Sequence, residues 1–227
     1  MALRIPGIGA FRDLHARFGL AAALQHAAHR LLNTVMYFEW MNIIVLQREH
    51  LRPLDPALTA RLSSRLATLE DLQAMQSNAR LDIGPVKLEY FRAGDACLLS
   101  YADGRLAGYT WAHTLGRPEL IPGFVISVPP EYLYNYAALT LPEFRGLGLQ
   151  PYRHRQLLDS GLWKDKSGLL GFVLQTNFAS RRGQAKSGYR TIGCVVLFGG
   201  RRCFWAWFSP ALRRRGIRRL PAIRRGS

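Results

Sequence analysis

The stretch "LTLPEFRGLGLQPYRHRQLLD", residues 139–159, runs from an apolar segment through two glycines into a basic, helix-like segment. A helix that begins here would leave its first backbone N–H groups without partners and place the positive end of its dipole at the turn. An anion binds well at such a point, and Gly146 and Gly148 would let it approach the backbone closely. Pro151 suits the first helical position, where its missing N–H costs little. The stretch therefore predicts a phosphate cradle or, more simply, a tight strand-to-helix turn.

Two common phosphate-binding motifs do not fit the stretch. The sequence has no G-x-x-x-x-G-K-S/T, so it does not predict a P-loop nucleotide site. It also has no G-x-G-x-x-G followed by an acidic residue about 20 positions later, so it does not predict a dinucleotide fold. The choice between a cradle and a plain turn then depends on the surrounding elements.

The surrounding pattern alternates short strands and helices. Residues 11–35 have helical periodicity, whereas residues 36–47 are rich in aromatic and β-branched residues, which is typical of a strand. "LRPLDPAL", residues 51–58, contains two prolines and predicts a linker. From residue 61 onward the patterns predict strands at 61–67, 96–101, 106–113, 132–141 and 169–176, a proline-rich loop over 118–130 and a final hairpin at 189–208. They predict helices at 68–76, 85–93, 177–188 and from the glycine turn to about residue 160. Two local signals support this division: the cap-like pair Thr68 and Asp71, and the hairpin dipeptide Asp103-Gly104.

This order of elements, with two motifs at matching positions, resembles the GNAT superfamily of acyltransferases. The superfamily signature R/Q-x-x-G-x-G/A follows a long strand and opens a helix, and residues 145–150 read R-G-L-G-L-Q. The preceding "TLPEFRG" looks like V-x-P-E-x-R-G, and "TNFASRRGQAKSGYRTIG", residues 176–193, is similar to N-x-x-A/S…K-x-G-F/Y. The resemblance covers residues 61–208. It implies an α/β (α+β) fold whose mixed central sheet is splayed where an acyl thioester binds.

The resemblance implies an N-acyltransferase that moves an acyl group from a thioester donor to an amine acceptor. The donor would be acyl-coenzyme A or an acyl carrier protein with a phosphopantetheine-linked acyl group, and no metal is implied. The alternative is an inactive protein of the same fold that binds nucleic acid or a membrane through its basic surface. The residues that the resemblance assigns to the pantetheine arm and the phosphates are Leu139, Leu141, Arg145, Gly146, Leu147, Gly148, Leu149, Gln150 and Asn177.

Two positions depart from the superfamily pattern. Gln150 lies where a small residue is preferred, so the cradle is expected to be wider or to hold phosphates differently. Gln184 lies where a tyrosine usually protonates the leaving thiol, so the general acid is unassigned. Glu131 and His113 are the nearest candidates for the general base. Either residue could instead have no catalytic role: Glu131 as a solvent-exposed acid in a loop, and His113 as a histidine that only packs in the structure.

We divide the chain into an N-terminal helix and strand extension (1–60), an acyltransferase domain (61–209) and a basic tail expected to be disordered (210–227). Nine of the sixteen net positive charges lie in residues 201–227, which contain no acidic residue. An acidic acyl carrier protein or an anionic membrane surface would suit this charge, and a merely solvated tail explains it equally. Nucleic acid is disfavoured, because residues 209–227 contain no aromatic side chain on which bases could stack.

The aromatic residues bear on the size of the acyl group, and the cysteines bear on the redox state of the protein. Aromatic side chains near the expected gap leave room for an acyl group larger than acetyl; they are Phe124, Tyr132, Tyr134 and Tyr136. The three cysteines are widely spaced and indicate neither a disulfide framework nor a zinc site, so we expect a reduced, cytoplasmic protein. No apolar run reaches the roughly 18 residues of a membrane span.

Overall fold

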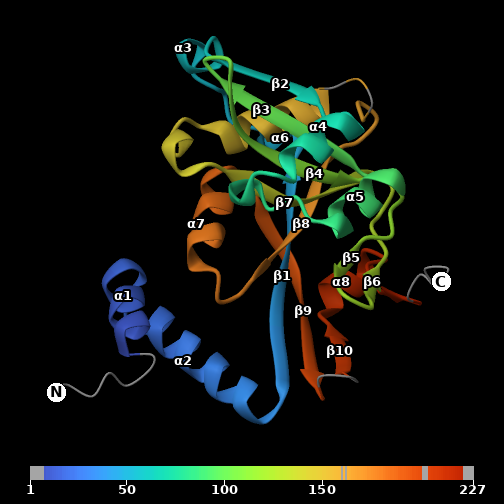
Figure 1. Cartoon of the computed structure of the whole chain (residues 1–227). Coiled ribbons are helices and arrows are strands. Elements are labelled where there is room, and N and C mark those ends of the chain that lie inside the picture. The colour runs from blue at the N-terminus through green and yellow to red at the C-terminus, as the bar shows by residue number, and fades with distance from the viewer. Residues whose placement is uncertain (1–7, 160, 162, 201–203, 222–227) are drawn as a thin grey trace.

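The structure is a computed structural model that describes residues 8–159, 161, 163–200 and 204–221 (Figure 1). In this part of the chain, a mixed sheet of eight strands has the order β10-β9-β1-β8-β7-β4-β3-β2, and a smaller sheet has the order β11-β6-β5. The strands are β1 Tyr37–Gln47, β2 Leu62–Leu66, β3 Ala96–Ala102, β4 Arg105–His113, β5 Glu119–Ile121, β6 Phe124–Ile126, β7 Tyr132–Thr140, β8 Gly168–Leu174, β9 Arg190–Gly199, β10 Phe204–Phe208 and β11 Arg219–Leu220. The expected α/β class is confirmed.

Helices cover both faces of the sheet. They are α1 Ile8–Phe18, α2 Leu20–Val35, α3 Pro56–Thr59, α4 Leu69–Met75, α5 Pro85–Arg92, α6 Leu149–Asp159, α7 Phe178–Lys186 and α8 Pro210–Arg214, with 3₁₀ turns at Arg48–His50, Ala79–Leu81 and Pro142–Phe144. Alternate residues of the hairpin β3–β4 divide between the two faces, as the period of a strand requires. Tyr109 and Trp111 pack in one cluster with Leu88 of α5, whereas Ala112 packs in another with Leu157 of α6. The sheet is therefore enclosed between α4–α5 on one side and α6 on the other.

Strand β1 lies inside the central sheet. It pairs with β8 along one edge and with β9 along the other, and residues 41–46 are all buried. A strand buried on both faces reads as a continuous apolar run, which explains the segment "MNIIVL". The sequence assigned this strand to an N-terminal extension, but the structure makes it part of the sheet that holds the expected acyltransferase elements together.

The N-terminal helical segment is broken in two. The sequence predicts one helix over residues 11–35, whereas the structure has α1 and α2 separated at Gly19, whose φ of +88° is outside the helical range. Glycine adopts this conformation without a Cβ clash. The break turns α2 away from α1, and Figure 1 shows α2 running down beside the lower end of β1.

The C-terminal segment is ordered where the structure describes it. The expected proline-rich loop contains β5 and β6, and β11 from the C-terminal segment pairs with β6. Leu212 and Ile217 are fully buried in the core beneath this small sheet. The expectation of a disordered tail is therefore wrong for residues 210–221, while residues 222–227 lie outside the described residues.

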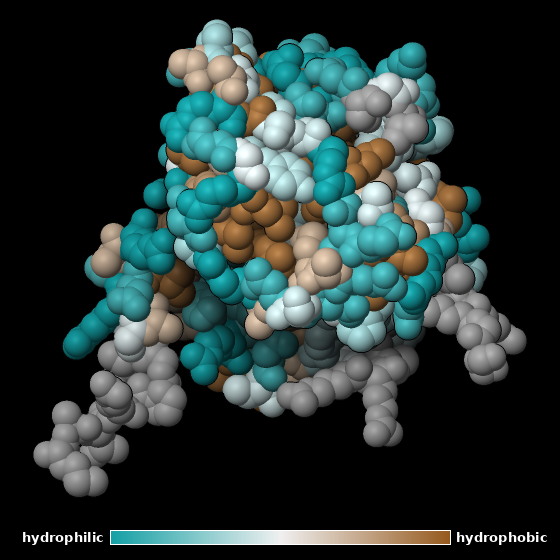
Figure 2. Space-filling view, turned by 45° about the horizontal axis from the view of Figure 1, so that its top comes forward, coloured by the Kyte–Doolittle hydropathy of each residue, from teal (hydrophilic) through white to brown (hydrophobic). Residues whose placement is uncertain are grey.

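The surface turned toward the viewer in Figure 2 is hydrophilic around its rim and hollowed near its centre, where hydrophobic side chains are exposed. Among the helices of the described residues, none has the length and apolar character needed to cross a bilayer.

Candidate active site

The candidate site lies where β7 and β8 separate. The two strands pair in parallel only from Tyr132 to Tyr134 on β7 and from Gly168 to Leu170 on β8. Beyond this point β7 continues beside β4, and β8 continues beside β1. Figure 1 shows β2, β3 and β4 running across the view, whereas β1 and β9 run down it. The two halves of the sheet therefore diverge from the last paired residues.

A bulge in β7 shapes this gap. The register between β4 and β7 shifts, and Ala137 has a positive φ of 46°. A bulge bends its strand and changes the direction of its side chains. Gly108 permits the close approach of the two strands, because a Cβ there would clash with the carbonyl oxygen of Leu139. Ala137 and Ala138 are consequently exposed although they belong to a strand of the central sheet.

A buried arginine ties α6 to the bulge. Arg153 is 1% exposed. Its guanidinium donates to the carbonyl oxygens of Tyr109, Leu139 and Leu149 and to the hydroxyl of Thr140. Burial lowers the pKa of Arg153 to about 10, so the side chain keeps its charge at neutral pH. The arginine therefore joins carbonyl oxygens of β4 and β7 on one side of the bulge to α6.

The glycine turn has the groups that an anion needs. Gly146 and Gly148 have φ values of +86° and +64°, which L side chains rarely adopt. Within the described residues, no acceptor is found for the backbone N–H groups of residues 146–150. These donors lie at the N-terminus of α6, where the helix dipole favours negative charge. Arg145 is exposed beside them.

Two neighbours limit the space at this turn. A Cβ added to Gly148 would lie 2.9 Å from Cδ2 of Leu58, which belongs to α3. The side-chain oxygen of Gln150 lies 3.7 Å from the place of a Cβ on Gly183, so α7 adjoins the start of α6. Pro151 is the third residue of α6 and not the first, as the sequence predicts, but it still lies in the turn whose N–H groups have no helical partner.

A cavity of about 220 Å³ opens beside the point of divergence. Tyr134, the last residue of β7 that pairs with β8, and Tyr136, just beyond it, line this cavity. Its other ionisable lining residues come from α5, the start of β3, the end of β4 and the segment that follows; they are Glu89, Tyr90, Asp95, His113, Arg117 and Glu119. A volume of this size can hold a small polar molecule, and three carboxylates favour a cationic one.

Within the cavity, Asp95 connects a histidine and a tyrosine. His113 Nδ1 lies 2.6 Å from Asp95 Oδ1, and the hydroxyl of Tyr136 donates to Asp95 Oδ2. The backbone N–H of Arg117 donates to His113 Nε2 at 3.3 Å. Since Nε2 accepts a hydrogen bond, Nδ1 carries the proton of the neutral ring and donates it to the carboxylate. Asp95 is 7% exposed, so its charge acts at close range on both partners.

Tyr134 and Tyr136 of the cavity remain protonated at neutral pH. Burial, with the nearby Asp95 carboxylate as the second cause, raises the pKa of Tyr136 far above its usual range. Burial likewise raises the pKa of Tyr134. Their hydroxyls therefore act in this site as hydrogen-bond donors and as walls of the cavity.

The sequence-predicted residues fall in different places. His113 lines the cavity, but Glu131 is exposed at the start of β7, where its backbone carbonyl accepts from Ser167 at the closed end of the strand pair. The carbonyl of Leu139 is occupied by Arg153, and the N–H of Leu141 donates to Ala107, so these two groups are already used within the protein.

The remaining predicted residues have structural contacts of their own. Asn177 caps α7, because its side-chain oxygen accepts from the N–H of Ser180 at 3.0 Å. Gln184 lies in the second turn of α7, and its side-chain oxygen is buried without a hydrogen-bond partner among the described residues. Over the described part of the chain, no group of three or more His, Cys, Asp or Glu side chains is placed to hold a metal ion.

Sequence reasoning missed the groups that surround His113 and the bulge. Asp95 and Arg153 carried no recognisable motif, and Tyr136 was expected only to accommodate an acyl group. The one available signal was the predicted hairpin around Asp103-Gly104. Its two strands run antiparallel, so the residue before the first strand, Asp95, comes close to the last residue of the second strand, His113.

No family model matches the sequence, and no curated protein matches it. Solved structures resemble the chain at low sequence identity. A protein from Novosphingobium aromaticivorans assigned to the GNAT family of acetyltransferases has 16% identity over 72% of this chain and 66% of its own, with a TM-score of 0.46. The GCN5-related N-acetyltransferase from Kribbella flavida has 16% identity over 83% of this chain and 66% of its own, also at 0.46. A conserved protein of unknown function from Staphylococcus epidermidis has 11% identity over 83% and 78%, at 0.48.

The chain thus spans just under two thirds of the length of the Novosphingobium and Kribbella proteins. With identities of 11–16% and TM-scores below 0.5, these likenesses do not establish an activity for this chain.

Proposed function

We propose that the protein is an N-acyltransferase that moves an acyl group from a thioester donor to a primary amine. The observation that carries the proposal is the divergence of β7 from β8, with unpaired N–H donors at the start of α6 and an acid–base cavity beside the gap. A reaction between two bound molecules needs both of them held at one place. The gap between β7 and β8 adjoins both the N-terminus of α6, where the donor would bind, and the cavity, where the acceptor would bind.

The donor would bind through its phosphates. The N–H groups of residues 146–150 and the charge of Arg145 suit the pyrophosphate of coenzyme A or the single phosphate of a phosphopantetheine arm. The acyl group would then reach the gap beside Ala137 and Ala138, the exposed residues of the bulge. A backbone N–H in this segment would stabilise the oxyanion that forms when the thioester carbonyl is attacked.

The acceptor would bind in the cavity, and His113 would move the proton. An ammonium group suits the carboxylates Glu89 and Glu119, but it must lose a proton before its nitrogen can attack. His113 Nε2 takes this proton after releasing the weak bond from Arg117, and Asp95 stabilises the resulting imidazolium. The amine nitrogen forms a bond to the carbonyl carbon and releases its second proton to solvent, the C–S bond breaks, and the imidazolium gives the first proton to the thiolate, so that an amide and a free thiol remain.

The proposal is tested by thiol release from acetyl-coenzyme A and longer acyl-coenzyme A donors in the presence of a panel of primary amines. We expect turnover with at least one amine, and His113→Gln should lower kcat by roughly 10²- to 10⁴-fold at neutral pH. The loss should shrink at high pH, where the amine deprotonates unaided.

Glu131→Gln is the matched comparison, because it removes the other candidate base from an exposed position. A loss below about threefold in this variant, beside a large loss in His113→Gln, would assign the base to His113. The opposite ranking would reassign it to Glu131. Binding of coenzyme A without turnover for any amine would favour the alternative, an inactive binding module.

A further inference from the structure

Helix α2 carries its apolar face outward. The residues that face the rest of the protein are mostly polar or small, and those with side chains at least partly buried include Gln25, His26, His29 and Asn33. The large apolar residues of the same helix are exposed; they are Leu20, Leu24, Leu31, Leu32 and Val35, and Leu31 and Val35 are 70% and 80% exposed. A surface helix of a soluble protein normally has the reverse arrangement.

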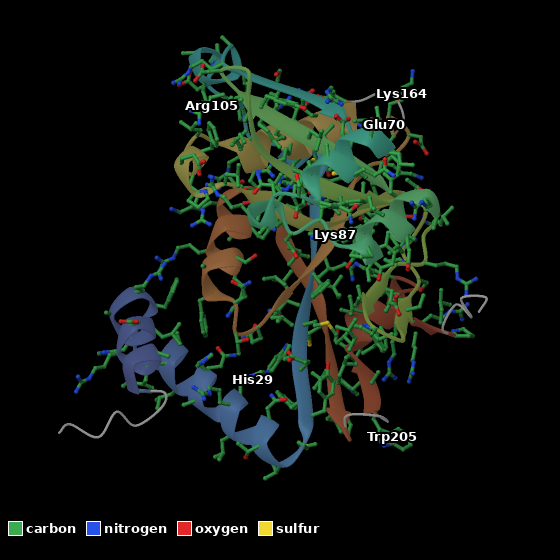
Figure 3. The ribbon with its side chains drawn as sticks, in the orientation of Figure 1. His29, Glu70, Lys87, Arg105, Lys164 and Trp205 are labelled. Carbon is green, nitrogen blue, oxygen red and sulfur yellow. The ribbon has the colours of Figure 1, made fainter. Side chains whose placement is uncertain are left out.

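The inward polar face is fixed by specific contacts. The side-chain amide of Asn33 donates to the carbonyl oxygen of Phe38 at 2.8 Å, and the N–H of Phe38 donates back to Asn33 at 3.1 Å. His29 lies 3.6 Å from the Glu39 carboxylate, and its ring packs against Phe38. Figure 3 shows His29 in the space between α2 and β1. These contacts hold the helix in an orientation that leaves its apolar stripe in water.

Exposed aromatic residues lie at the same end of the molecule. Phe198 pairs with Trp205 across β9 and β10, and Val196 pairs with Trp207, so these side chains share one face of the sheet. Trp205 is 73% exposed, and Figure 3 shows it at the end of β10, pointing away from the sheet. The C-terminal end of α2 leads directly into β1, which pairs with β9 at this end.

We propose that this end of the protein, the outward stripe of α2 with the aromatic face of β9 and β10, docks on an anionic lipid bilayer. An apolar helix face flanked by tryptophan is the composition that lies in a membrane interface. The charge is complementary, because the chain has a net charge of +16 and α2 contains Arg30 and no acidic residue. Arg12 and Arg17 of α1 are also exposed.

A second copy of the chain fits this surface less well. The stripe of α2 alone, 16 residues and about 24 Å long and about 10 Å wide, covers roughly 240 Å² per partner, so the aromatic face of β9 and β10 would have to supply most of a dimer contact. A stable protein interface buries about 800 Å² per partner. Two copies that each carry +16 also repel each other, whereas an anionic bilayer attracts the chain.

The test is sedimentation of the full chain with vesicles of phosphatidylcholine alone and of phosphatidylcholine with about 30% phosphatidylserine, with no substrate present. We expect binding to the anionic vesicles, and the double variant Leu31→Asp, Val35→Asp should lower the partition coefficient at least tenfold. Trp205→Ser should lower it by a smaller factor. Because the replaced side chains are exposed, thermal unfolding should be unchanged.

Val86→Asp is the matched control, because Val86 is 51% exposed but lies on α5 away from α2. It adds one of the two negative charges that the double variant adds, and it should leave the partition coefficient within about twofold of the parent value. Equal partition of the parent and the Leu31→Asp, Val35→Asp variant would overturn the proposal. So would an absence of vesicle binding together with a dimer that this double variant dissociates, which would assign the face to a second copy. The experiment needs no acyltransferase activity, so its result is independent of the proposed function.

Discussion

Arg153 shows how much one buried side chain contributes to the shape of the gap. Its guanidinium satisfies carbonyl oxygens of β4 and β7 at the bulge, and within the described residues no ion pair joins it to a carboxylate. Arg153→Met keeps much of the volume but removes the donor that bonds to the carbonyl oxygens of Tyr109 and Leu139. We expect a loss of about 2 kcal/mol or more in the free energy of unfolding, measured by urea denaturation.

Arg155→Met is the control for this prediction. Arg155 lies on the same helix, is only partly buried and donates to the exposed Arg52 carbonyl. Its replacement should change the free energy of unfolding by less than about 0.5 kcal/mol. Equal effects of the two replacements would show that the bonds of Arg153 to the strands contribute nothing specific.

His154, the next residue of α6, makes stability depend on pH. It is 1% exposed and packs against the ring of Tyr189, and burial lowers its pKa to about 3, with the neighbouring Arg153 as a second cause. The unfolded chain takes up a proton on this histidine near pH 6.5, whereas the folded chain does not. The histidine therefore destabilises the fold by about 1.4 kcal/mol for each pH unit below 6.5, down to about pH 3.

His154→Phe should remove this dependence. Urea denaturation at pH 7.5, 5.5 and 4.5 should show the free energy of unfolding of the variant rising relative to that of the parent protein as the pH falls. A constant difference for His154→Phe would mean that His154 takes up its proton at the same pH in the folded and the unfolded protein.

At the scale of elements, the N-terminus of α6 offers a test of the phosphate cradle. A Cβ at Gly146 meets nothing within 4 Å, whereas one at Gly148 approaches Leu58, so Gly146 is the better position to alter. Aspartate and asparagine tolerate its positive φ better than other residues do. Gly146→Asp should weaken binding of coenzyme A at least tenfold by calorimetry, because the new carboxylate repels the phosphates.

Gly146→Asn has nearly the same shape without the charge, and it should weaken binding less than about threefold. If the two variants bind coenzyme A equally well, charge at this turn does not matter and the cradle is only a strand-to-helix corner.

Much of the element order was readable from the sequence, because its signals are local. Thr68 and Asp71 form the expected capping box, and Asp103 and Gly104 both have positive φ in the hairpin turn. The position of β1 between β8 and β9 could not be read, since it depends on pairing between distant segments. Nothing in a local pattern says which edge of a sheet a strand will join.

The pairing of Asp95 with His113 in the candidate site depends on a shift of one residue in the register between β3 and β4. The hairpin turn pairs Ala102 with Arg105, and a regular ladder would then place Asp95 opposite Ala112. A bulge after Ser100 shifts the register, so that Ala96 pairs with Ala112 and Asp95 reaches His113. One step of register reverses the face of every later side chain, and the sequence contains no clear sign of the bulge. His113 was therefore a candidate without a visible partner.

At the scale of the whole molecule, the positive charge can separate the two classes of donor. Arg213, Arg214 and Arg215 are exposed at α8. An acidic carrier protein would be attracted by this surface from a distance, whereas coenzyme A needs only the local cradle. If a carrier protein is the donor, kcat/KM should fall steeply between about 0.05 and 0.5 M salt, since the Debye length shortens severalfold.

Replacing the three arginines by glutamine should reproduce that fall at low salt and leave the reaction with acyl-coenzyme A nearly unchanged. Equal salt dependence for the two donors, unaffected by the replacement, would exclude steering by α8.

The placement of β1 also affects how the chain is made. Residues 37–47 leave the ribosome about 120 residues before β8 and still longer before β9, which are the strands on either side of β1. At a synthesis rate of about 5 to 20 residues per second, this segment waits roughly 6 to 24 s for its first neighbour. During that time a segment with five core residues, Met41 and residues 43–46, has no sheet to join. The nascent chain is therefore most exposed to aggregation, and most in need of a chaperone, before its second half has been translated.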